Sequence, residues 1–240
     1  MKNLIIIPTY NEVENIELLI DEIFKVFSDI SILVVDDNSP DDTYGLVKKI
    51  SEERPNVYSI KREGKLGLAS AYIDGFKWGI EKGFEAFLEM DADFSHNPKY
   101  LKNMVENIEN YEVVIGSRNI KGGSVLGWSL LRFITSKGGS LYSRFILGFP
   151  PIYDLTGGFN MWRKSALEKI NLDSVKAKGY LFQIEMKYKA WKADCSIKEF
   201  PIHFENRRKG KSKMSAKIFL EAFINVWSIR FVRNTKKENK

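Results

Sequence analysis

The first half of the chain alternates short apolar runs with segments of helical periodicity, and this alternation constrains the fold more than any other feature. "NLIIIP" (3–8) and "SILVVDD" (31–37) are almost continuously apolar and rich in β-branched residues. Such runs are typical of central strands buried on both faces. "NVYSI", "EAFLEMD" and "YEVVIGS" predict three further strands. Strands alternating with helices predict a mostly parallel, open α/β sheet flanked by helices.

Helical spacing fills the intervals between these strands. In residues 12–27, apolar side chains recur every three or four positions and acidic residues occupy the other face. Weaker patterns of this kind cover residues 41–51, 67–81 and 98–109. No linker interrupts the chain, so we expect a single domain over residues 1–214.

The second half is expected to extend the same sheet. It offers a strand near "FNMWR", a helix near "FQIEMKYKAW" and a strand near "SIKEFPI". Residues 215–240 predict an amphipathic helix and a charged tail. Two interpretations of this helix stay open: it packs against the core, or it lies on a membrane surface with its basic residues near anionic lipid.

Composition and charge exclude several classes of protein. The single cysteine, Cys195, cannot form an internal disulfide and indicates a reducing environment, where we expect it to be a buried free thiol. No uncharged apolar stretch approaches the roughly 18 residues needed to span a bilayer. The net charge of +6 is concentrated in Lys and Arg after residue 207, which favours an anionic partner. No nucleic-acid-binding motif is present, so a phosphate or lipid partner is preferred over nucleic acid.

Polar residues follow four of the predicted strands, where ligands bind in open α/β sheets. These segments are "PTYNE", "DDNSPDDT", "DADFSH" and "GSR". The first contains no glycine, although a dinucleotide site needs G-x-G-x-x-G at this position. The pattern therefore disfavours NAD and flavin.

Asp91 and Asp93 are either a metal site or the polar end of a buried strand. Two neighbouring carboxylates repel each other, and keeping both ionised requires a nearby cation. Oxygen ligands alone select a hard ion, Mg²⁺ or Mn²⁺. His96 could add a nitrogen ligand, but a capping or solvent-facing side chain is the preferred interpretation. In "DDNSPDDT", Asn38 to Asp42 predict a turn with an aspartate cap near Asp41 or Asp42.

These segments, together with "KLGLASAYIDGF", "GGSVLGW", "DLTGGF", "GYLFQIEM" and "NRRKGKSKM", resemble polyprenol-phosphate (dolichol-phosphate) mannose synthases. Those enzymes are inverting glycosyltransferases of family 2 with the Rossmann-like GT-A fold. The resemblance extends over nearly the whole chain, from about Ile5 to Phe223. It implies transfer of mannose from GDP-mannose to a polyprenyl phosphate at the cytoplasmic side of a membrane. The protein would reach its lipid acceptor as a peripheral protein or through a membrane-anchoring subunit.

The resemblance also implies site residues. Asp91 and Asp93 would bind Mg²⁺ or Mn²⁺, Ser95 stands where some relatives have a third ligand, and Arg118 would approach the reacting phosphates. Gln183 would face the sugar. Nucleotide-sugar contacts would come from Pro8, Tyr10, Asn11, Glu12, Asp37, Asp41, Asp91 and Asp154. The acceptor phosphate would be held by Arg132, Ser136, Arg207 and Lys213.

A phosphate acceptor is already anionic at neutral pH, so it needs no general base. The site must instead restrain repulsion between two anions and stabilise the leaving group. A UDP-glucose-dependent transfer to the same acceptor is the alternative, because the base pocket does not distinguish GDP from UDP. A nucleic-acid-binding protein and an inactive scaffold of the same fold are weaker hypotheses.

Overall fold

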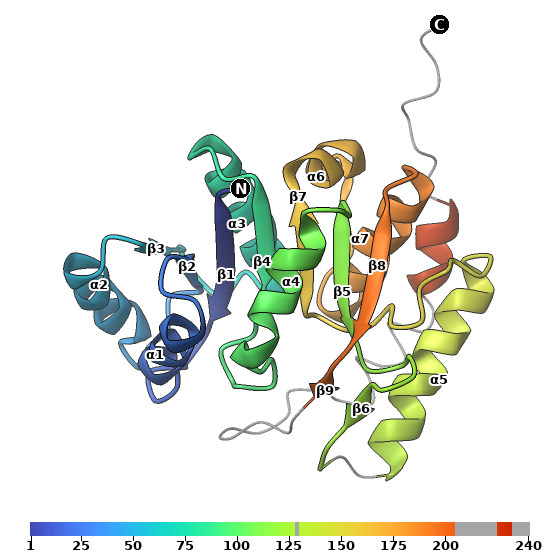
Figure 1. The fold of residues 1–240 in the computed structure, drawn as a ribbon, viewed down its shortest axis with the longest axis horizontal. Helices are drawn as coiled ribbons and strands as arrows, with labels where there is room; N and C mark the ends of the chain where they lie inside the picture. Colours follow the sequence, from blue (N-terminus) through green and yellow to red (C-terminus); the bar gives the residue numbers. More distant parts are fainter. Residues whose placement is uncertain (128–129, 205–224, 232–240) are drawn as a thin grey trace, which may run out of the picture.

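A computed structural model describes residues 1–127, 130–204 and 225–231 of the protein. Its centre is a seven-stranded sheet in the order β3-β2-β1-β4-β7-β5-β8 (Figure 1). In that order the strands are Val57–Lys61, Ser31–Asp36, Asn3–Thr9, Ala86–Glu89, Asn160–Arg163, Val113–Ser117 and Ile197–Pro201. Neighbouring strands are parallel except at β7, which runs antiparallel to both β4 and β5. The predicted mostly parallel open sheet is confirmed.

The continuous apolar runs arise because both faces of the sheet are buried. In β1, Leu4 and Ile6 enter one hydrophobic core, while Ile5 and Ile7 enter the other. Successive side chains of a strand point to opposite faces. All four of these side chains are completely buried. A strand with one solvated face would instead have alternated polar and apolar residues.

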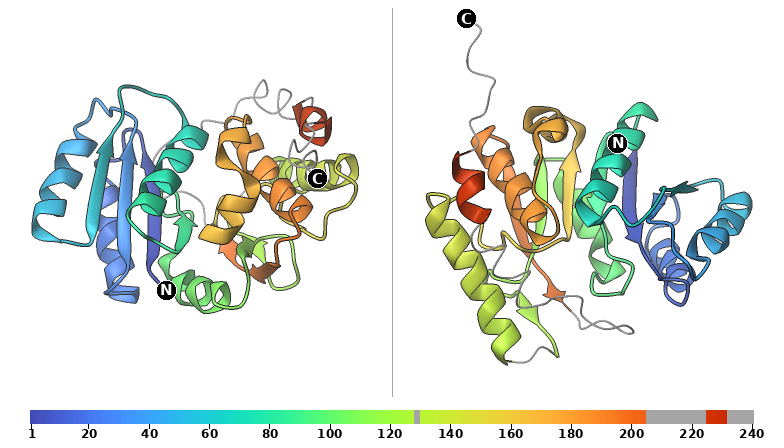
Figure 2. Two further views of the ribbon diagram at one scale, coloured as in Figure 1. Left: turned by 90° about the horizontal axis from the view of Figure 1, so that it is seen from above. Right: turned by 180° about the vertical axis from the view of Figure 1, so that it is seen from behind.

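Helices cover the two faces as separate layers (Figure 2). The first core includes side chains from α3, α6 and α7, and the second includes side chains from α1, α2 and α4. The helices are α1 (Ile16–Val26), α2 (Thr43–Glu53), α3 (Leu68–Glu81), α4 (Leu101–Ile108), α5 (Leu130–Ile146), α6 (Lys164–Ile170) and α7 (Tyr180–Lys192). Short 3₁₀ turns, η1 (Pro98–Tyr100) and η2 (Leu172–Ser174), precede α4 and follow α6.

The second half confirms three predictions and adds elements that were not predicted. "FNMWR" contains β7, "FQIEMKYKAW" lies within α7, and "SIKEFPI" contains β8. The 17-residue helix α5 was not predicted. A small parallel sheet of β6 (Ser124–Val125) and β9 (His203–Phe204) was not predicted either.

Part of the predicted C-terminal helix is described, as a helix of residues 225–231 (red in Figure 1). Val226 and Ile229 are buried and belong to the core beside α7. For this segment the core-packing interpretation is therefore correct for one face; the rest of residues 215–240 lies outside the described residues. Within the described part of the chain, no helix is both long and apolar enough to cross a bilayer.

Cys195 is a buried free thiol, as expected. Burial raises the pKa of Cys195 to about 11. Because the thiolate is the reactive form of cysteine, this thiol is unreactive at neutral pH.

Candidate active site

The strand topology brings the four predicted polar segments to one edge of the sheet. β1, β2 and β4 are mutually parallel. β5 points the same way, because β4 and β5 are both antiparallel to the β7 that separates them. The same edge receives the N-terminal end of β7, and with it the preceding "DLTGGF" segment. The carboxyl ends and this segment therefore form one candidate site.

The loop after β4 folds back on itself around the two aspartates. The backbone N–H of Asp91 donates to Nδ1 of His96 at 3.0 Å, and the N–H of Ser95 donates to Oδ1 of Asp93 at 3.1 Å. The hydroxyl of Tyr72 lies 3.4 Å from Oδ1 of Asp91. Asp93 is buried and Asp91 is partly buried. The loop thus presents two carboxylates in a defined conformation.

His96 is not solvent-facing, and that alternative is wrong. Its ring is 1% exposed and packs 5.0 Å from the ring of Phe159. Burial lowers the pKa of His96, with Asp91 and Asp93 acting in the opposite direction. A neutral imidazole can accept the Asp91 N–H at Nδ1. His96 therefore stabilises the loop that carries the two aspartates.

The residues of this loop fit a hard divalent cation. Asp91 and Asp93 supply carboxylate oxygens, and the buried Ser95 Oγ has no hydrogen-bond partner among the described residues. No cluster of three or more His, Cys, Asp or Glu side chains suited to a metal occurs in residues 1–127, 130–204 and 225–231. A two-carboxylate site suits Mg²⁺ or Mn²⁺, because such ions keep water ligands and bridge phosphates.

The segments after β1 and β2 are joined by backbone-to-side-chain hydrogen bonds. Asn11, in a left-handed conformation with φ of 59°, donates its N–H to Oγ of Ser39 at 3.0 Å. The N–H of Glu12 donates to Oγ1 of Thr43 at 3.0 Å. Nζ of Lys65 lies 4.0 Å from the centre of the Tyr10 ring. Pro8 lies within β1, paired with Val35. The residues predicted in "PTYNE" to contact the nucleotide are thus held against the turn after β2.

Asp36 and Asp41 hold the turn after β2. Asp36 is completely buried and accepts from the hydroxyls of Thr9 and Ser39 at 2.8 and 2.6 Å. Asp41 accepts from the N–H of Thr43 and the N–H of Val13, both at 3.1 Å. Of the two predicted caps, Asp41 therefore supplies the side-chain oxygen at the start of α2. Burial opposes its ionisation, but the hydrogen bonds from Thr43 and Val13 lower the pKa of Asp41.

Asp37 is paired with an arginine that we did not predict as a site residue. Nη1 of Arg62 lies 2.5 Å from Oδ1 of Asp37, and the N–H of Gly67 donates to Oδ2 at 2.8 Å. Nη2 of Arg62 also donates to Oγ of Ser70 at 2.7 Å. A carboxylate has about four acceptor positions, so Asp37 can also accept from a ligand. Arg62 directly follows β3, so the strand-end rule applied to the other strands could have found it.

The Arg62 and Asp37 pair gives a stability prediction. Arg62→Ala removes the cation and leaves the buried Asp37 carboxylate with the Gly67 N–H alone. We expect unfolding in urea to show a loss of about 2 to 3 kcal/mol. The matched control is Arg54→Ala, because Arg54 pairs with Asp21 at 2.8 Å where both side chains are more than a third exposed. That variant should lose about 1 kcal/mol or less, and equal losses in the two variants would contradict the prediction.

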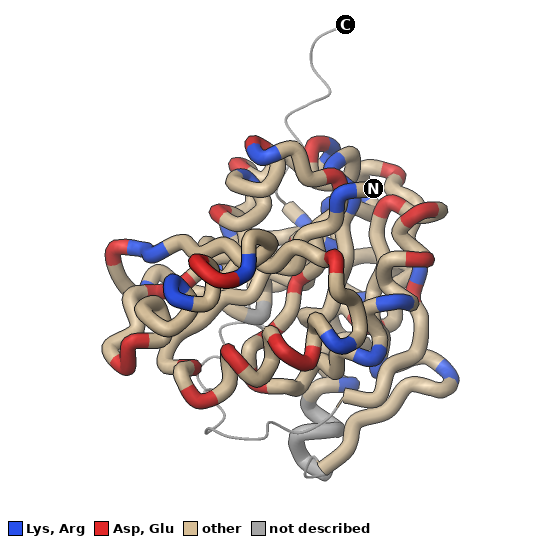
Figure 3. The backbone as a smooth tube through the Cα atoms, turned by 60° about the vertical axis from the view of Figure 1, so that its left-hand side comes forward, with Lys and Arg blue, Asp and Glu red and all other residues tan. Residues whose placement is uncertain are grey.

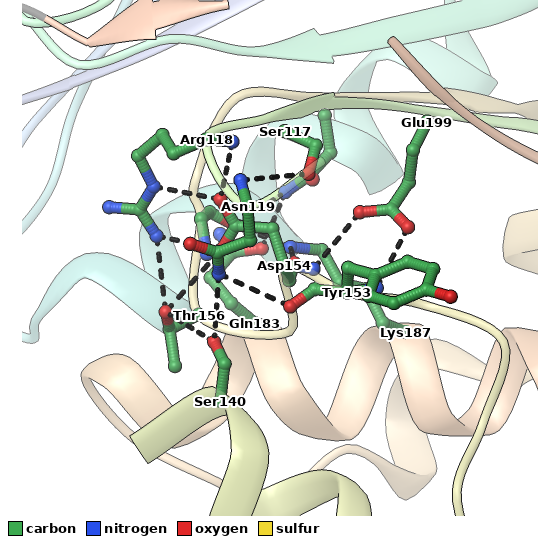
Figure 4. A network of polar contacts seen from close by, with 12 residues as sticks. Ser117, Arg118, Asn119, Ser140, Tyr153, Asp154, Thr156, Gln183, Lys187 and Glu199 are labelled. Carbon is green, nitrogen blue, oxygen red and sulfur yellow. Dashed lines mark hydrogen bonds and ion pairs between the residues drawn. The ribbon is translucent and has the colours of Figure 1, made fainter. Parts of the chain in front are cut away.

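Arg118, at the end of β5, is held by Asp154 (Figure 4). The backbone N–H and Nε of Arg118 donate to Oδ2 of Asp154 at 3.0 and 2.7 Å, and Nη2 donates to Oδ1 at 2.7 Å. Nη2 also donates to Oγ1 of Thr156 at 3.1 Å. Asp154 is completely buried, which by itself raises its pKa, but the Arg118 guanidinium and Lys187 hold the pKa of Asp154 well below its usual range. The carboxylate thus fixes the guanidinium.

Lys187 of α7, also unpredicted, is completely buried beneath this pair. Its Nζ donates to the carbonyl oxygens of Asp154 and Gly157 at 2.8 and 2.6 Å. Burial lowers the pKa of Lys187 to about 8. The N–H of Gly157 donates back to Oδ1 of Asp154 at 2.9 Å. Gly157 therefore belongs to a tight turn around Asp154.

Gln183 joins a second buried cluster beside the site. Nδ2 of Asn160 donates to Oε1 of Gln183 at 2.7 Å and to Oε2 of Glu89 at 2.6 Å. Burial raises the pKa of Glu89 to about 7. Nε2 of Gln183 is buried and has no hydrogen-bond partner among the described residues. A Cβ on Gly158 would lie 3.6 Å from the ring of His96 and 3.8 Å from this Nε2. Gln183 thus lies near the loop that carries the aspartates.

The predicted acceptor-phosphate residues are only partly described. Ser136 lies on α5 one turn before Ser140, whose Oγ is 3.2 Å from Oγ1 of Thr156. Arg132 lies on α5 four residues before Ser136, but its side chain is not among those described. Arg207 and Lys213 lie outside the described residues. The face of α5 that carries Ser136 therefore borders the Arg118 cluster.

Comparison with known proteins identifies the family. Residues 4–171 match the model of "Glycosyl transferase family 2". The chain is 41% identical over 226 residues to undecaprenyl-phosphate mannosyltransferase of Micrococcus luteus, covering 94% of this chain and 93% of that protein. It is also 41% identical over 233 residues to polyprenol monophosphomannose synthase of Mycolicibacterium smegmatis, covering 95% and 88%.

A solved structure has the same fold at low sequence identity. The mannosyltransferase PcManGT from Pyrobaculum calidifontis, in complex with GDP-Man and Mn²⁺, matches with a TM-score of 0.59 and 17% identity, covering 94% of this chain and 69% of that one. The expected GT-A fold is thereby confirmed. The protein belongs to glycosyltransferase family 2.

Proposed function

We propose that this protein transfers mannose, with inversion, from GDP-mannose to a polyprenyl phosphate and forms polyprenyl-phosphate mannose. The observation that carries the proposal is the 41% identity, over more than nine-tenths of this chain, to two relatives named for polyprenyl-phosphate mannosyl transfer. Because the acceptor is a lipid, the proposal includes peripheral action at a membrane surface. The GT-A domain of residues 1–214 and a membrane-anchoring subunit stay predictions.

Asp91 and Asp93 are proposed to hold the divalent cation, Mg²⁺ or Mn²⁺. When bound, the cation supplies positive charge to the departing diphosphate. The loop geometry supports this role, since hydrogen bonds from the Asp91 N–H to His96 and from the Ser95 N–H to Asp93 fix the conformation of the loop. A mannosyltransferase of this fold in complex with GDP-Man and Mn²⁺ adds support.

Arg118 is proposed to neutralise charge where the two anions meet. Arginine suits this role because its guanidinium stays protonated and binds phosphate oxygens in pairs. Asp154 then acts as a positioning residue rather than a direct sugar contact, because its carboxylate is completely buried and engaged by Arg118. Ser136, Arg132, Arg207 and Lys213 are proposed to bind the acceptor phosphate.

The nucleotide is proposed to bind at residues 8–12 and the adjoining turn after β2. Pro8, Tyr10, Asn11 and Glu12 come from the first segment, with Asp37 and Asp41 from the second. Asp37 and Asp41 already accept hydrogen bonds from the protein, so they would bind a nucleotide through their remaining acceptor positions. Gln183, with its buried Nε2, is proposed to donate to the sugar.

The donor is tested by direct comparison of two nucleotide sugars. Purified protein is incubated with Mn²⁺, a short-chain polyprenyl phosphate and either GDP-mannose or UDP-glucose, and the lipid fraction is analysed for attached sugar. The proposal predicts a mannolipid from GDP-mannose and little glucolipid from UDP-glucose. A preference for UDP-glucose would replace the donor assignment, and no glycolipid from either donor would refute the transfer itself.

A further inference from the structure

Six large apolar side chains are exposed on neighbouring parts of α5, the following loop and the helix of residues 225–231. We call this set the aromatic face; its members are Leu141, Phe145, Phe149, Tyr153, Trp227 and Phe231. Their exposed fractions range from 45% for Trp227 to 71% for Phe231. Single exposed apolar residues are ordinary, but a contiguous group marks an interaction surface.

Direct contacts join four members of the aromatic face into two pairs and connect the two helices that carry them. The rings of Phe145 and Phe149 are 5.9 Å apart, and those of Trp227 and Phe231 are 6.3 Å apart. Nε1 of Trp227 donates to the hydroxyl of Tyr142 at 3.0 Å, which joins the two helices. The buried side of the short helix is already occupied by Val226 and Ile229, so core packing does not account for its two exposed aromatic residues.

The two chain segments that carry the aromatic face, residues 113–153 and 225–231, contain basic residues and no acidic ones. No Asp or Glu occurs between Glu112 and Asp154, and the helix of residues 225–231 contains none. The basic residues in these segments are Arg118, Lys121, Arg132, Lys137, Arg144 and Arg230. Figure 3 turns forward the side of the protein that carries α1 and α2. On that side, acidic and basic residues are mixed. Outside these segments, Glu199 accepts the backbone N–H of Tyr153 at 2.7 Å. Exposed aromatic residues on segments whose charged side chains are all basic complement an anionic lipid surface.

From these observations we propose that the aromatic face docks on an anionic lipid bilayer. The inference rests on the proposed function, because that function places the acceptor lipid in a membrane. α5 links the face to the site, because Ser140 contacts Thr156 in the Arg118 cluster and Phe145 follows five residues later. That interval is about 7.5 Å along a helix. Docking through α5 would therefore bring the acceptor-binding side of the site close to the lipid headgroups.

Flotation with lipid vesicles tests the docking surface without requiring catalysis. The double variant Phe145→Ser and Phe231→Ser is compared with Leu18→Ser, since Leu18 is 57% exposed on α1. Wild type and Leu18→Ser should float with phosphatidylcholine vesicles that contain phosphatidylglycerol, and less with phosphatidylcholine alone. The double variant should partition to the mixed vesicles at least about tenfold more weakly.

Several outcomes would overturn the inference. It fails if wild type does not float, or if the double variant floats as well as wild type. It also fails if gel filtration shows that the double variant converts a wild-type dimer to a monomer while neither binds vesicles. In that case the aromatic face would be a contact between copies of the chain.

The choice of acceptor separates this inference from the proposed function. With a water-soluble short-chain acceptor, the double variant should transfer mannose at the wild-type rate. With the acceptor embedded in mixed vesicles, its rate should fall at least about tenfold, in line with its weaker binding. Equal losses with both acceptors would contradict a membrane role. If wild type transfers to neither acceptor, the proposed function fails, while flotation still tests the aromatic face.

Discussion

Asp93→Asn is expected to lower the rate of metal-dependent sugar transfer by at least about a hundredfold. Groups that only support a metal ligand already cost about 10- to 100-fold when removed, and Asp93 is proposed to be a ligand itself. The amide oxygen of Asn can still accept the Ser95 N–H that bonds Oδ1 in the wild type at 3.1 Å. We therefore expect an unchanged circular dichroism spectrum and a nearly unchanged unfolding midpoint. The rate is measured at saturating Mn²⁺ and donor.

The control for this variant is Asp42→Asn. Asp42 is another aspartate beyond a strand end, but it is exposed and its side chain makes no capping hydrogen bond with α2. This substitution should leave the transfer rate within about twofold of wild type, because exposed surface changes have small effects. Wild-type activity in Asp93→Asn would remove Asp93 from the metal site. Equal losses in both variants would point to a general charge effect instead.

Asp154→Ala is expected to destabilise the protein by about 3 to 5 kcal/mol and to lower transfer as well. The variant leaves the guanidinium of Arg118, itself 8% exposed, without its carboxylate partner. Removing one member of a buried ion pair has a cost of this size. Transfer falls because the Arg118 guanidinium loses its two bonds to Asp154 and keeps the one to Thr156. Urea unfolding gives the stability, and the rate is measured where the variant remains folded.

The stability conferred by Asp154 should depend on pH in a defined direction. Its pKa is held below the usual value in the folded state, so the unfolded chain binds more protons in acid. The contribution is fully present above the unfolded pKa of about 3.9 and is lost as the pH falls toward the folded value. The gap between wild type and Asp154→Ala should therefore be widest near neutrality and should narrow below about pH 4.

Asp173→Ala provides the exposed comparison for Asp154→Ala. Asp173 pairs with Lys77 at 2.6 Å, but its side chain is 76% exposed. Its removal should cost about 1 kcal/mol or less. A similarly small loss in Asp154→Ala, or a gap that stays constant from neutral to acid pH, would show that Arg118 does not depend on Asp154.

The sheet could be predicted from the sequence because its strands obey a simple rule. A strand buried on both faces is apolar along its interior, and β1 and β2 follow this rule at residues 4–8 and 32–35. The helices after β1 and β3 are amphipathic, so the helical spacing of their apolar residues can be recognised in the sequence. In contrast, α5 was missed because it contains adjacent glycines, Gly138 and Gly139, and serine and threonine residues that disfavour helices. Its tertiary contacts override these local preferences.

The strand-end rule located the candidate site, but the supporting residues were harder to predict. Lys187 and Glu89 are charged residues that are completely buried. Charged residues are rarely fully buried, so a sequence pattern places them on the surface. Their burial depends on partners distant in sequence, such as the carbonyls of Asp154 and Gly157 for Lys187. Only the fold brings these groups together.

The measurement that tests the central claim most directly is the mass and anomeric configuration of the lipid product formed from GDP-mannose. Attack by an acceptor phosphate oxygen in a single displacement converts the α-linked donor to a β-linked mannosyl phosphate. Mass spectrometry should therefore show one hexose added to the polyprenyl phosphate, and NMR should show the β configuration. An α-linked product would contradict single displacement, and the absence of any mannosylated lipid would contradict the assigned reaction.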